Sequence, residues 1–314
     1  MFTVIGEALL DMVQPVPGGA FSPRPGGGPM NIAVGLKRLG HPTALMARLS
    51  TGALGDIVRH HIEGNELELA TCVSTTEQTT LAFATLDEER RASYEFYVEG
   101  TADWGWTDEE LDSLPSEAAA VHTGSLAAFL APGADAILAR WQHWNAEGQL
   151  LLSFDPNVRP ALVGPRPQAV SRVERLVAAS HVVKASDEDL EWLYPDQLPV
   201  EAVRRWARIG PELVVMTRGA DGCLAVRRDG DAVLERPGRS VAVVDTIGAG
   251  DAFESGLLSG LADATDLQPG GVERLSDEDL LAVLDRAIWV SALTCQREGA
   301  DPPTRAEYDA AAAG

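Results

Sequence analysis

Short apolar runs alternate with helical stretches through the second half of this 314-residue chain, and this alternation constrains the fold more than any other feature. The runs cover 121–124, 150–155, 181–184 and 213–217, and helical stretches such as 132–147 and 167–179 separate them. The pattern predicts a mostly parallel sheet covered by helices on both faces. Ligands of such sheets bind at the carboxyl ends of the strands, where this chain carries Asp155, Asn157, Lys184 and Thr217.

The segment 241–256 reads as a short apolar strand, a glycine turn and the start of a helix. Gly248 and Gly250 permit a tight turn, and a helix beginning near Gly250 directs free N–H groups at whatever binds there. The segment therefore predicts an anion site, suited to a phosphate. Asp251 falls in the first helical turn, so we interpret it as the group that takes a proton from an attacking hydroxyl. A helix-capping aspartate is the alternative.

Two earlier segments also point to a ligand. The glycine loop 26–31 leads into a helix expected over 32–39, a strand is expected over 43–48, and Gly55 and Asp56 open the next helix. Residues 79–98 alternate on both sides of the charged segment 87–91, which predicts a β-hairpin with a charged tip. Its aromatic residues Tyr94, Phe96 and Tyr97 either cover a ligand or pack on a sheet face.

Composition narrows the class of protein. The formal net charge is −22, which argues against nucleic acid and anionic membranes as partners. Residues 118–139 are too interrupted to span a bilayer, and the N-terminus lacks the pattern of a signal peptide. Three widely spaced cysteines fit a reducing cytoplasm. The histidines, among them His122, show no ligand spacing and read as structural or surface residues.

The glycine-rich segments together resemble the ribokinase/fructokinase family of carbohydrate kinases, and most of all the bacterial fructokinases. The signatures are 26–40 with 52–56 behind it, and 245–253. A Rossmann fold would need Gly-x-Gly-x-x-Gly after the first strand, and this chain lacks it. The resemblance implies a single ribokinase-like kinase domain over 1–314, with a three-layer α/β fold: a mostly parallel central sheet, helices on both faces, and a small β lid formed by about 10–22 and 79–103.

The resemblance also implies roles for individual residues. Asp251 is the catalytic base, and the amides of Gly248, Ala249 and Gly250 form the anion hole. The sugar-binding positions are Asp11, Gly27, Asn31, Phe96 and Arg159. Asp and Asn together supply the acceptors and donors that sugar hydroxyls need. The alternatives are a loop-capping role for Asp11, a helix cap for Asn31 and a surface ion pair for Arg159.

ATP and Mg²⁺ are the implied cosubstrate and metal. The ATP-binding positions are Lys184, Ser186, Thr217, Gly219 and Gly222. Asp189 replaces a glutamate of the family and has a shorter reach, so we expect it to contact magnesium through a water molecule. Asp245 and Ile247 match a monovalent-cation site. Pro303 stands where ribokinases have a serine, which leaves K⁺ dependence open.

The resemblance predicts an ATP-dependent sugar kinase that phosphorylates fructose, with the 6-hydroxyl as the family expectation. A keto-acid sugar would need a cation in the lid, and the lid as bounded above carries only Arg90 and Arg91, at the hairpin tip. A 2-keto-3-deoxygluconate kinase and a ribokinase are the alternatives. A non-catalytic sugar or nucleotide sensor is the competing class of function. A homodimer that pairs through the lid is open.

Overall fold

Eight strands form one central sheet, which runs in the order β14-β13-β12-β11-β10-β9-β1-β4. The computed structural model describes residues 1–14, 18–86, 92–228 and 232–313. Six neighbouring strands are parallel, and β13 and β14 add an antiparallel edge. The strand bounds are β1 Phe2–Ile5, β4 Thr43–Met46, β9 Ala120–Gly124, β10 Leu151–Asp155, β11 Val182–Ser186, β12 Leu213–Thr217, β13 Cys223–Arg227 and β14 Val233–Arg236.

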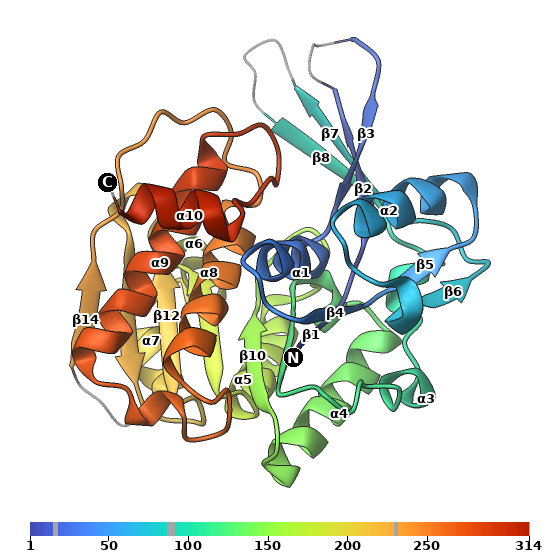
Figure 1. The fold of residues 1–314 in the computed structure, drawn as a ribbon. Helices are drawn as coiled ribbons and strands as arrows, with labels where there is room; N and C mark the ends of the chain where they lie inside the picture. The colour runs from blue at the N-terminus through green and yellow to red at the C-terminus, as the bar shows by residue number, and fades with distance from the viewer. Residues whose placement is uncertain (15–17, 87–91, 229–231, 314) are drawn as a thin grey trace.

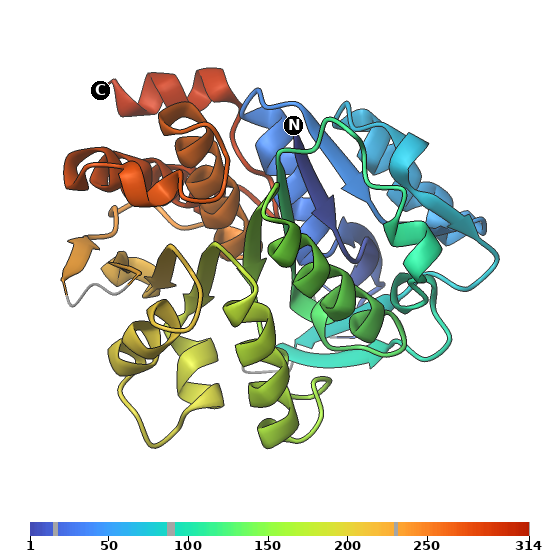
Figure 2. The same cartoon turned by 90° about the horizontal axis from the view of Figure 1, so that it is seen from below.

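Helices cover both faces of this sheet, as the alternation predicted (Figures 1 and 2). One face carries α3 Asp108–Leu111, α4 Gly133–Glu147, α5 Arg166–Ala178, α6 Asp187–Leu193 and α7 Pro199–Ala207. The other carries α1 Gly28–Arg38, α2 Ala53–Gly64, α8 Ala249–Ala264 and α9 Asp277–Cys295, and α10 Arg305–Ala312 packs on α9. Among the described residues no helix is long and apolar enough to cross a membrane.

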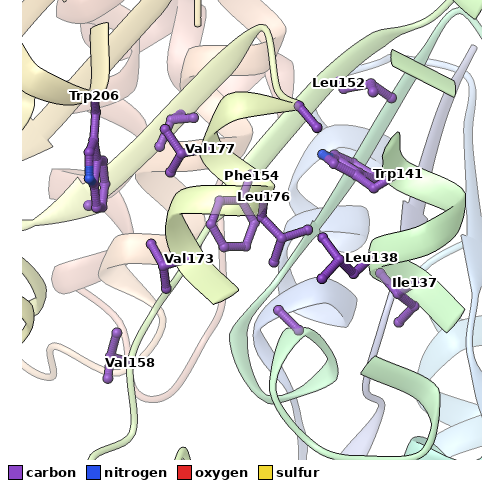
Figure 3. Close-up of a cluster of buried hydrophobic side chains, with 14 of the residues drawn as sticks. Ile137, Leu138, Trp141, Leu152, Phe154, Val158, Val173, Leu176, Val177 and Trp206 are labelled. Carbon is purple, nitrogen blue, oxygen red and sulfur yellow. The ribbon is translucent and has the colours of Figure 1, made fainter. Parts of the chain in front are cut away.

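Alternate side chains of each central strand enter two separate apolar clusters, one on each face. In β10, Leu151 belongs to the cluster under α1 and α8, whereas Leu152 and Phe154 belong to the cluster under α4 to α7. Figure 3 shows Phe154 in that second cluster with Trp141 of α4 and Trp206 of α7. Burial on both faces is why these strands read as continuous apolar runs.

A second sheet of four strands stands beside the central one and extends away from it (Figure 1). Its order is β3-β2-β7-β8, with β2 Leu9–Val13, β3 Ser22–Gly26, β7 Leu81–Leu86 and β8 Ala92–Tyr97. We call it the small sheet. β7 and β8 form the expected antiparallel hairpin. The expected charged tip, with Arg90 and Arg91, lies outside the described residues. Two further strands, β5 Arg48–Ser50 and β6 Val73–Thr75, form a short pair.

Three local predictions were wrong. The helix expected over 32–39 begins four residues earlier, at Gly28, because Pro29 favours the first helical turn. The strand expected over 43–48 is interrupted between β4 and β5. The strand expected at 241–244 is absent: the segment leaves the sheet after β14, and the Val244 amide donates to Cys295 O (2.8 Å).

Candidate active site

The glycine turn before α8 has the geometry of an anion site. Gly248 precedes the helix in the left-handed conformation, with φ 74°. A Cβ there would lie 2.5 Å from the Cβ of Ala300, so both the backbone angle and the packing require glycine. The Ala249 amide donates to Thr246 O over 3.2 Å, whereas the Gly248 and Gly250 amides have no backbone acceptor among the described residues. The turn therefore presents two free amides at the positive end of a 16-residue helix.

Asp251 lies buried in the first turn of α8, directly after this glycine turn. Its Oδ2 accepts a hydrogen bond from Asn31 Nδ2 over 2.8 Å, a contact between residues 220 apart in the sequence. Burial raises the pKa of Asp251, and the Asn31 hydrogen bond and nearby cations, Lys184 first, oppose that shift. A carboxylate with a raised pKa beside an anion site is suited to accept a proton.

Asn31 reaches Asp251 because α1 starts early. Asn31 lies in the first turn of α1 rather than in the loop before it, so Asn31 is not the helix cap that we considered as the alternative. A Cβ on Gly28 would lie 3.4 Å from Asp251 Oδ1 and 3.2 Å from Asn157 Nδ2. The two glycine-rich turns of the sequence thus converge on one carboxylate.

The small sheet contributes the next part of the site. Asp11 in β2 pairs with Ala82 in β7, which pairs with Phe96 in β8, so these three residues share one row and one face of the sheet. Burial raises the pKa of Asp11 to about 6, with a further increase from Asp251 and an opposing effect from Arg159. Asp11 therefore lies within electrostatic reach of both residues.

Gly27 and Arg159 complete the predicted sugar-side residues. Gly27 has φ 115°, and a Cβ there would lie 2.6 Å from Glu7 O, so the loop packs too tightly for a side chain. Arg159 is exposed and donates to Asn157 Oδ1 (2.6 Å) and Val158 O (3.2 Å). Because it has no ion pair with a carboxylate among the described residues, the surface ion pair that we considered is not formed there.

Lys184 of β11 lies beside the anion site. Its buried Nζ donates to Asp155 Oδ2 over 2.7 Å and lies 3.2 Å from the position of a Cβ on Gly250. Burial alone lowers the pKa of Lys184, but Asp155 and two further carboxylates outweigh it and the net shift is upward. Burial raises the pKa of Asp155 to about 6. A fixed ammonium here suits a site that binds phosphate.

The other predicted nucleotide residues lie around the ends of β11 and β12. Thr217 ends β12, and Gly219 follows with φ 51° and open space around it. A Cβ on Gly222 would lie 2.1 Å from Arg236 O, so packing against the end of β14 already accounts for that glycine. Ser186 caps α6 by accepting from the Asp189 amide (3.0 Å), which gives it a structural function as well.

The predicted metal residues are engaged with the protein itself. Asp189 Oδ1 accepts from the Val158 amide (2.7 Å), and Oδ2 accepts from Ser186 N (2.9 Å) and Oγ (2.7 Å). Asp245 accepts from the amides of Ile247 (3.1 Å) and Gly299 (2.9 Å). In the described part of the chain no group of three or more His, Cys, Asp or Glu could hold a metal. Direct ligation of magnesium by Asp189 therefore fits poorly, and contact through water stays a prediction.

Sequence reasoning missed a second layer of buried polar residues. His122, read from the sequence as structural or surface, and Ser153 and Glu254 form one buried cluster beneath Asp251. Glu7 and Asp103 form another beneath the Gly27 loop, and burial raises their pKa values to about 7 and about 6. The one sequence signal was Glu254 itself, an acidic residue in an otherwise apolar stretch of α8.

Comparison with known proteins finds relatives of one family over nearly the whole chain. The model of the pfkB family carbohydrate kinases matches residues 1–307. A fructokinase of Rhizobium leguminosarum bv. trifolii is 34% identical over 266 residues, which cover 83% of this chain and 79% of that protein.

Two solved structures are similar in fold. A fructokinase of Xylella fastidiosa with bound ATP has a TM-score of 0.89 and 29% identity, and covers 98% of this chain and 97% of that one. A double mutant of the Vibrio cholerae O395 fructokinase, with fructose, ADP and a potassium ion, has a TM-score of 0.82 at 25% identity over 98% and 97%. They confirm the predicted three-layer fold. With its two converging glycine turns, this chain belongs to the pfkB family of carbohydrate kinases.

Proposed function

We propose that this kinase transfers the γ-phosphoryl group of MgATP to fructose, with Asp251 as the general base. The observation that carries the proposal is the Asn31–Asp251 hydrogen bond of 2.8 Å, because it joins the helix after the early glycine loop to the helix after the anion turn. A hydroxyl held beside α1 has both the proton acceptor and the anion site next to it.

The reaction we infer is an in-line displacement. The attacking hydroxyl gives its proton to Asp251, its oxygen bonds to the γ-phosphorus, and the bond from that phosphorus to the bridging oxygen of ADP breaks. The free amides at Gly248 and Gly250 and the buried ammonium of Lys184 would stabilise the charge on the transferring group. Mg²⁺ bound to the ATP phosphates would neutralise further charge, and we infer contact with Asp189 only through water.

The nucleotide lies, in this proposal, across the loop after β12 and the turn before α8. Gly219 has open space around it, and Val243, Val244 and Ile247 are exposed apolar side chains on the same approach to the turn. Exposed apolar residues beside an anion site suit an adenine ring with its phosphates. The Xylella fastidiosa relative, which was solved with ATP, supports this assignment.

Fructose is the substrate that the relatives favour, although one sequence argument for it needs correction. The small sheet includes β3, so Arg24 is a further arginine of the lid, on the same row as Asp11. Arg24 is paired with Glu298 (2.6 Å), which makes it less available to a sugar carboxylate. The curated Rhizobium relative and the fructose-bound Vibrio structure support fructose. Attack by the 6-hydroxyl remains the family expectation.

We infer that the small sheet acts as a lid, because Asp11 and Phe96 lie on one of its faces while Phe21 and Tyr97 are exposed. Phe83 packs edge-on against both of these exposed rings, at centroid distances of 5.0 and 5.4 Å. This aromatic row is where two copies would pair if the enzyme dimerises through its lid. Size-exclusion chromatography with light scattering on Tyr97→Ser tests that proposal.

A monovalent-cation site near Asp245 and Ile247 is supported by the potassium-bound relative. Asp245 already ties the 245–247 loop to Gly299, so a cation there would tighten a loop that is partly held. We expect K⁺ to raise kcat less than tenfold over Na⁺. The three cysteines are free, in line with a reducing cytoplasm.

The experiment that tests the function is coupled ADP release with MgATP on fructose, ribose, 2-keto-3-deoxygluconate and adenosine. Asp251→Asn should lower kcat on fructose by ~10²–10⁴-fold. Asp277→Asn is the matched control, because Asp277 also lies in the first turn of a long helix, α9, but is exposed. Turnover confined to 2-keto-3-deoxygluconate would contradict the fructose assignment, and ATP binding without turnover on any sugar would favour a sensor.

A further inference from the structure

Three buried polar residues from three elements meet beneath the catalytic base. Glu254 lies one turn after Asp251 on α8, His122 lies in β9, and Ser153 lies opposite it in β10. Each is at most 1% exposed. Ser153 Oγ donates to Glu254 Oε1 over 2.6 Å, and His122 Nδ1 lies 3.1 Å from Ser153 Oγ and 3.4 Å from Glu254 Oε1.

This polar cluster contributes less to stability than an apolar contact between α8 and the sheet would. His122 Nε2 and Glu254 Oε2 have no hydrogen-bond partner among the described residues, although both atoms are buried. Apolar side chains of similar size would join the helix to the sheet at least as stably as a buried cluster of ionisable groups. Stability alone therefore does not explain the cluster, and its place in the site does.

The cluster borders the site on two sides. His122 lines a narrow crevice with Gly28 and Asp155: a Cβ on Gly28 would lie 3.4 Å from Asp251 Oδ1, and Asp155 holds Lys184. Glu254 is one of the carboxylates that act on Lys184 and Asp155. The three residues thus connect the first turn of α8 to the strands that position the ammonium.

We propose that Glu254, Ser153 and His122 are positioning residues for phosphoryl transfer: they fix the first turns of α8, and with them Asp251, against β9 and β10. The proposal rests on Asp251 being the base. A shift of about 1 Å in a reacting group costs up to ~10²-fold in rate, so a fixed helix start matters for turnover.

Two variants separate positioning from stability. His122→Gln keeps a buried polar side chain but loses the ring that contacts Ser153 and Glu254, so kcat should fall about 10-fold while KM for fructose stays within about 2-fold of wild type. Ser153→Ala should lower kcat about 10-fold with KM for fructose within about 2-fold of wild type. Ser180→Ala is the matched control, a buried serine that accepts from Trp141 Nε1 (2.8 Å) far from the base.

The outcomes are distinguishable. An unchanged kcat in a folded His122→Gln overturns the positioning by His122, and a Ser153→Ala turnover equal to that of Ser180→Ala at a similar Tm overturns the positioning by Ser153. If His122→Gln does not fold, the two serine variants decide. Wild-type turnover in Asp251→Asn would instead remove the proposed base. Loss of turnover in Asp251→Asn, together with wild-type kinetics in His122→Gln and Ser153→Ala, would overturn this inference and leave the proposed function standing.

Discussion

The two glycine turns of the site look alike in sequence but are built differently. The early turn, before α1, is fixed from within: Gly27 packs against Glu7 O, and Gly28 against Asn157 and Asp251. The late turn, before α8, is open on one side only: Gly248 packs against Ala300, but Gly250 is exposed, and only Lys184 Nζ lies near its Cβ position. The first turn suits a rigid wall for a sugar, and the second suits an entry for a charged phosphoryl group.

Adding one methyl group to each turn gives the largest effects expected from this difference between the turns. Gly27→Ala places a Cβ 2.6 Å from Glu7 O at φ 115°, and the backbone strain alone costs ~1–3 kcal/mol, so the Tm should fall markedly. Gly250→Ala adds its Cβ 3.2 Å from Lys184 Nζ without backbone strain, so the Tm should stay near wild type while kcat falls about 10–100-fold. Thermal unfolding and steady-state kinetics on both variants test the contrast. Equal losses of stability would contradict it.

A smaller effect is expected on the sugar side alone. Asp11→Asn removes a carboxylate that we propose binds sugar hydroxyls, and hydrogen bonds to a charged group contribute ~1.5–3 kcal/mol. KM for fructose should therefore rise about 10–100-fold while KM for ATP stays unchanged. Because the pKa of Asp11 is raised to about 6, wild-type KM for fructose should also rise as the pH falls through 6. Equal changes in both KM values would contradict a sugar-side role.

Asp11→Asn should weaken fructose binding, but it should make the folded protein more stable at high pH. A carboxyl whose pKa is raised in the folded state binds its proton more tightly there than in the unfolded chain. The stabilisation this gives is present at low pH and is lost as the pH rises through about 6. Asp11→Asn should therefore unfold at a higher temperature than wild type at pH 8, and no gain at pH 8 would contradict the raised pKa.

The link between the two turns gives the next prediction. Asn31→Ala removes the donor that favours the ionised form of Asp251, so the pKa of that carboxyl should rise further. We expect kcat/KM for fructose to fall about 10-fold at neutral pH and its acid limb to move upward. A profile measured from pH 5 to pH 9 tests this. A uniform loss at every pH would show that Asn31 acts only by binding the sugar.

The same contrast explains what could be predicted from the sequence. The parallel strands and the turn at 248–251 were predictable because apolar runs and glycines are local signals. The run at 241–244 misled because its apolar side chains do not enter the core: Val243 and Val244 are exposed, and the Val244 amide donates to Cys295 O instead of to a strand. Asn31 was misplaced although Pro29 signalled the helix start. The Glu254–Ser153 contact joins residues 101 apart, so the acidic Glu254 in an apolar stretch signalled burial but not its partner.

The smallest expected effect concerns the buried carboxylates under the early turn. Glu7 accepts from the Ala127 amide (3.1 Å), and burial, with a smaller contribution from Asp103, raises its pKa from 4.5 to about 7. Its protonated form is therefore favoured in the folded chain, and stability should fall as the pH rises from about 4.5 through 7. The rigid wall of the site is thus least stable where Glu7 is ionised.

Glu7→Gln tests this pH dependence, because the glutamine side chain stays neutral at every pH and its carbonyl oxygen can still accept from the Ala127 amide. At pH 8 it should raise the Tm by a few degrees, corresponding to at most on the order of 3 kcal/mol. At pH 5, where wild-type Glu7 is already protonated, the two proteins should unfold together. A gain of the same size at both pH values would mean that packing, and not ionisation, sets the cost of this buried carboxyl. Packing alone would then set the stability of the early turn, and the ionisation of Glu7 would no longer distinguish this turn from the one before α8.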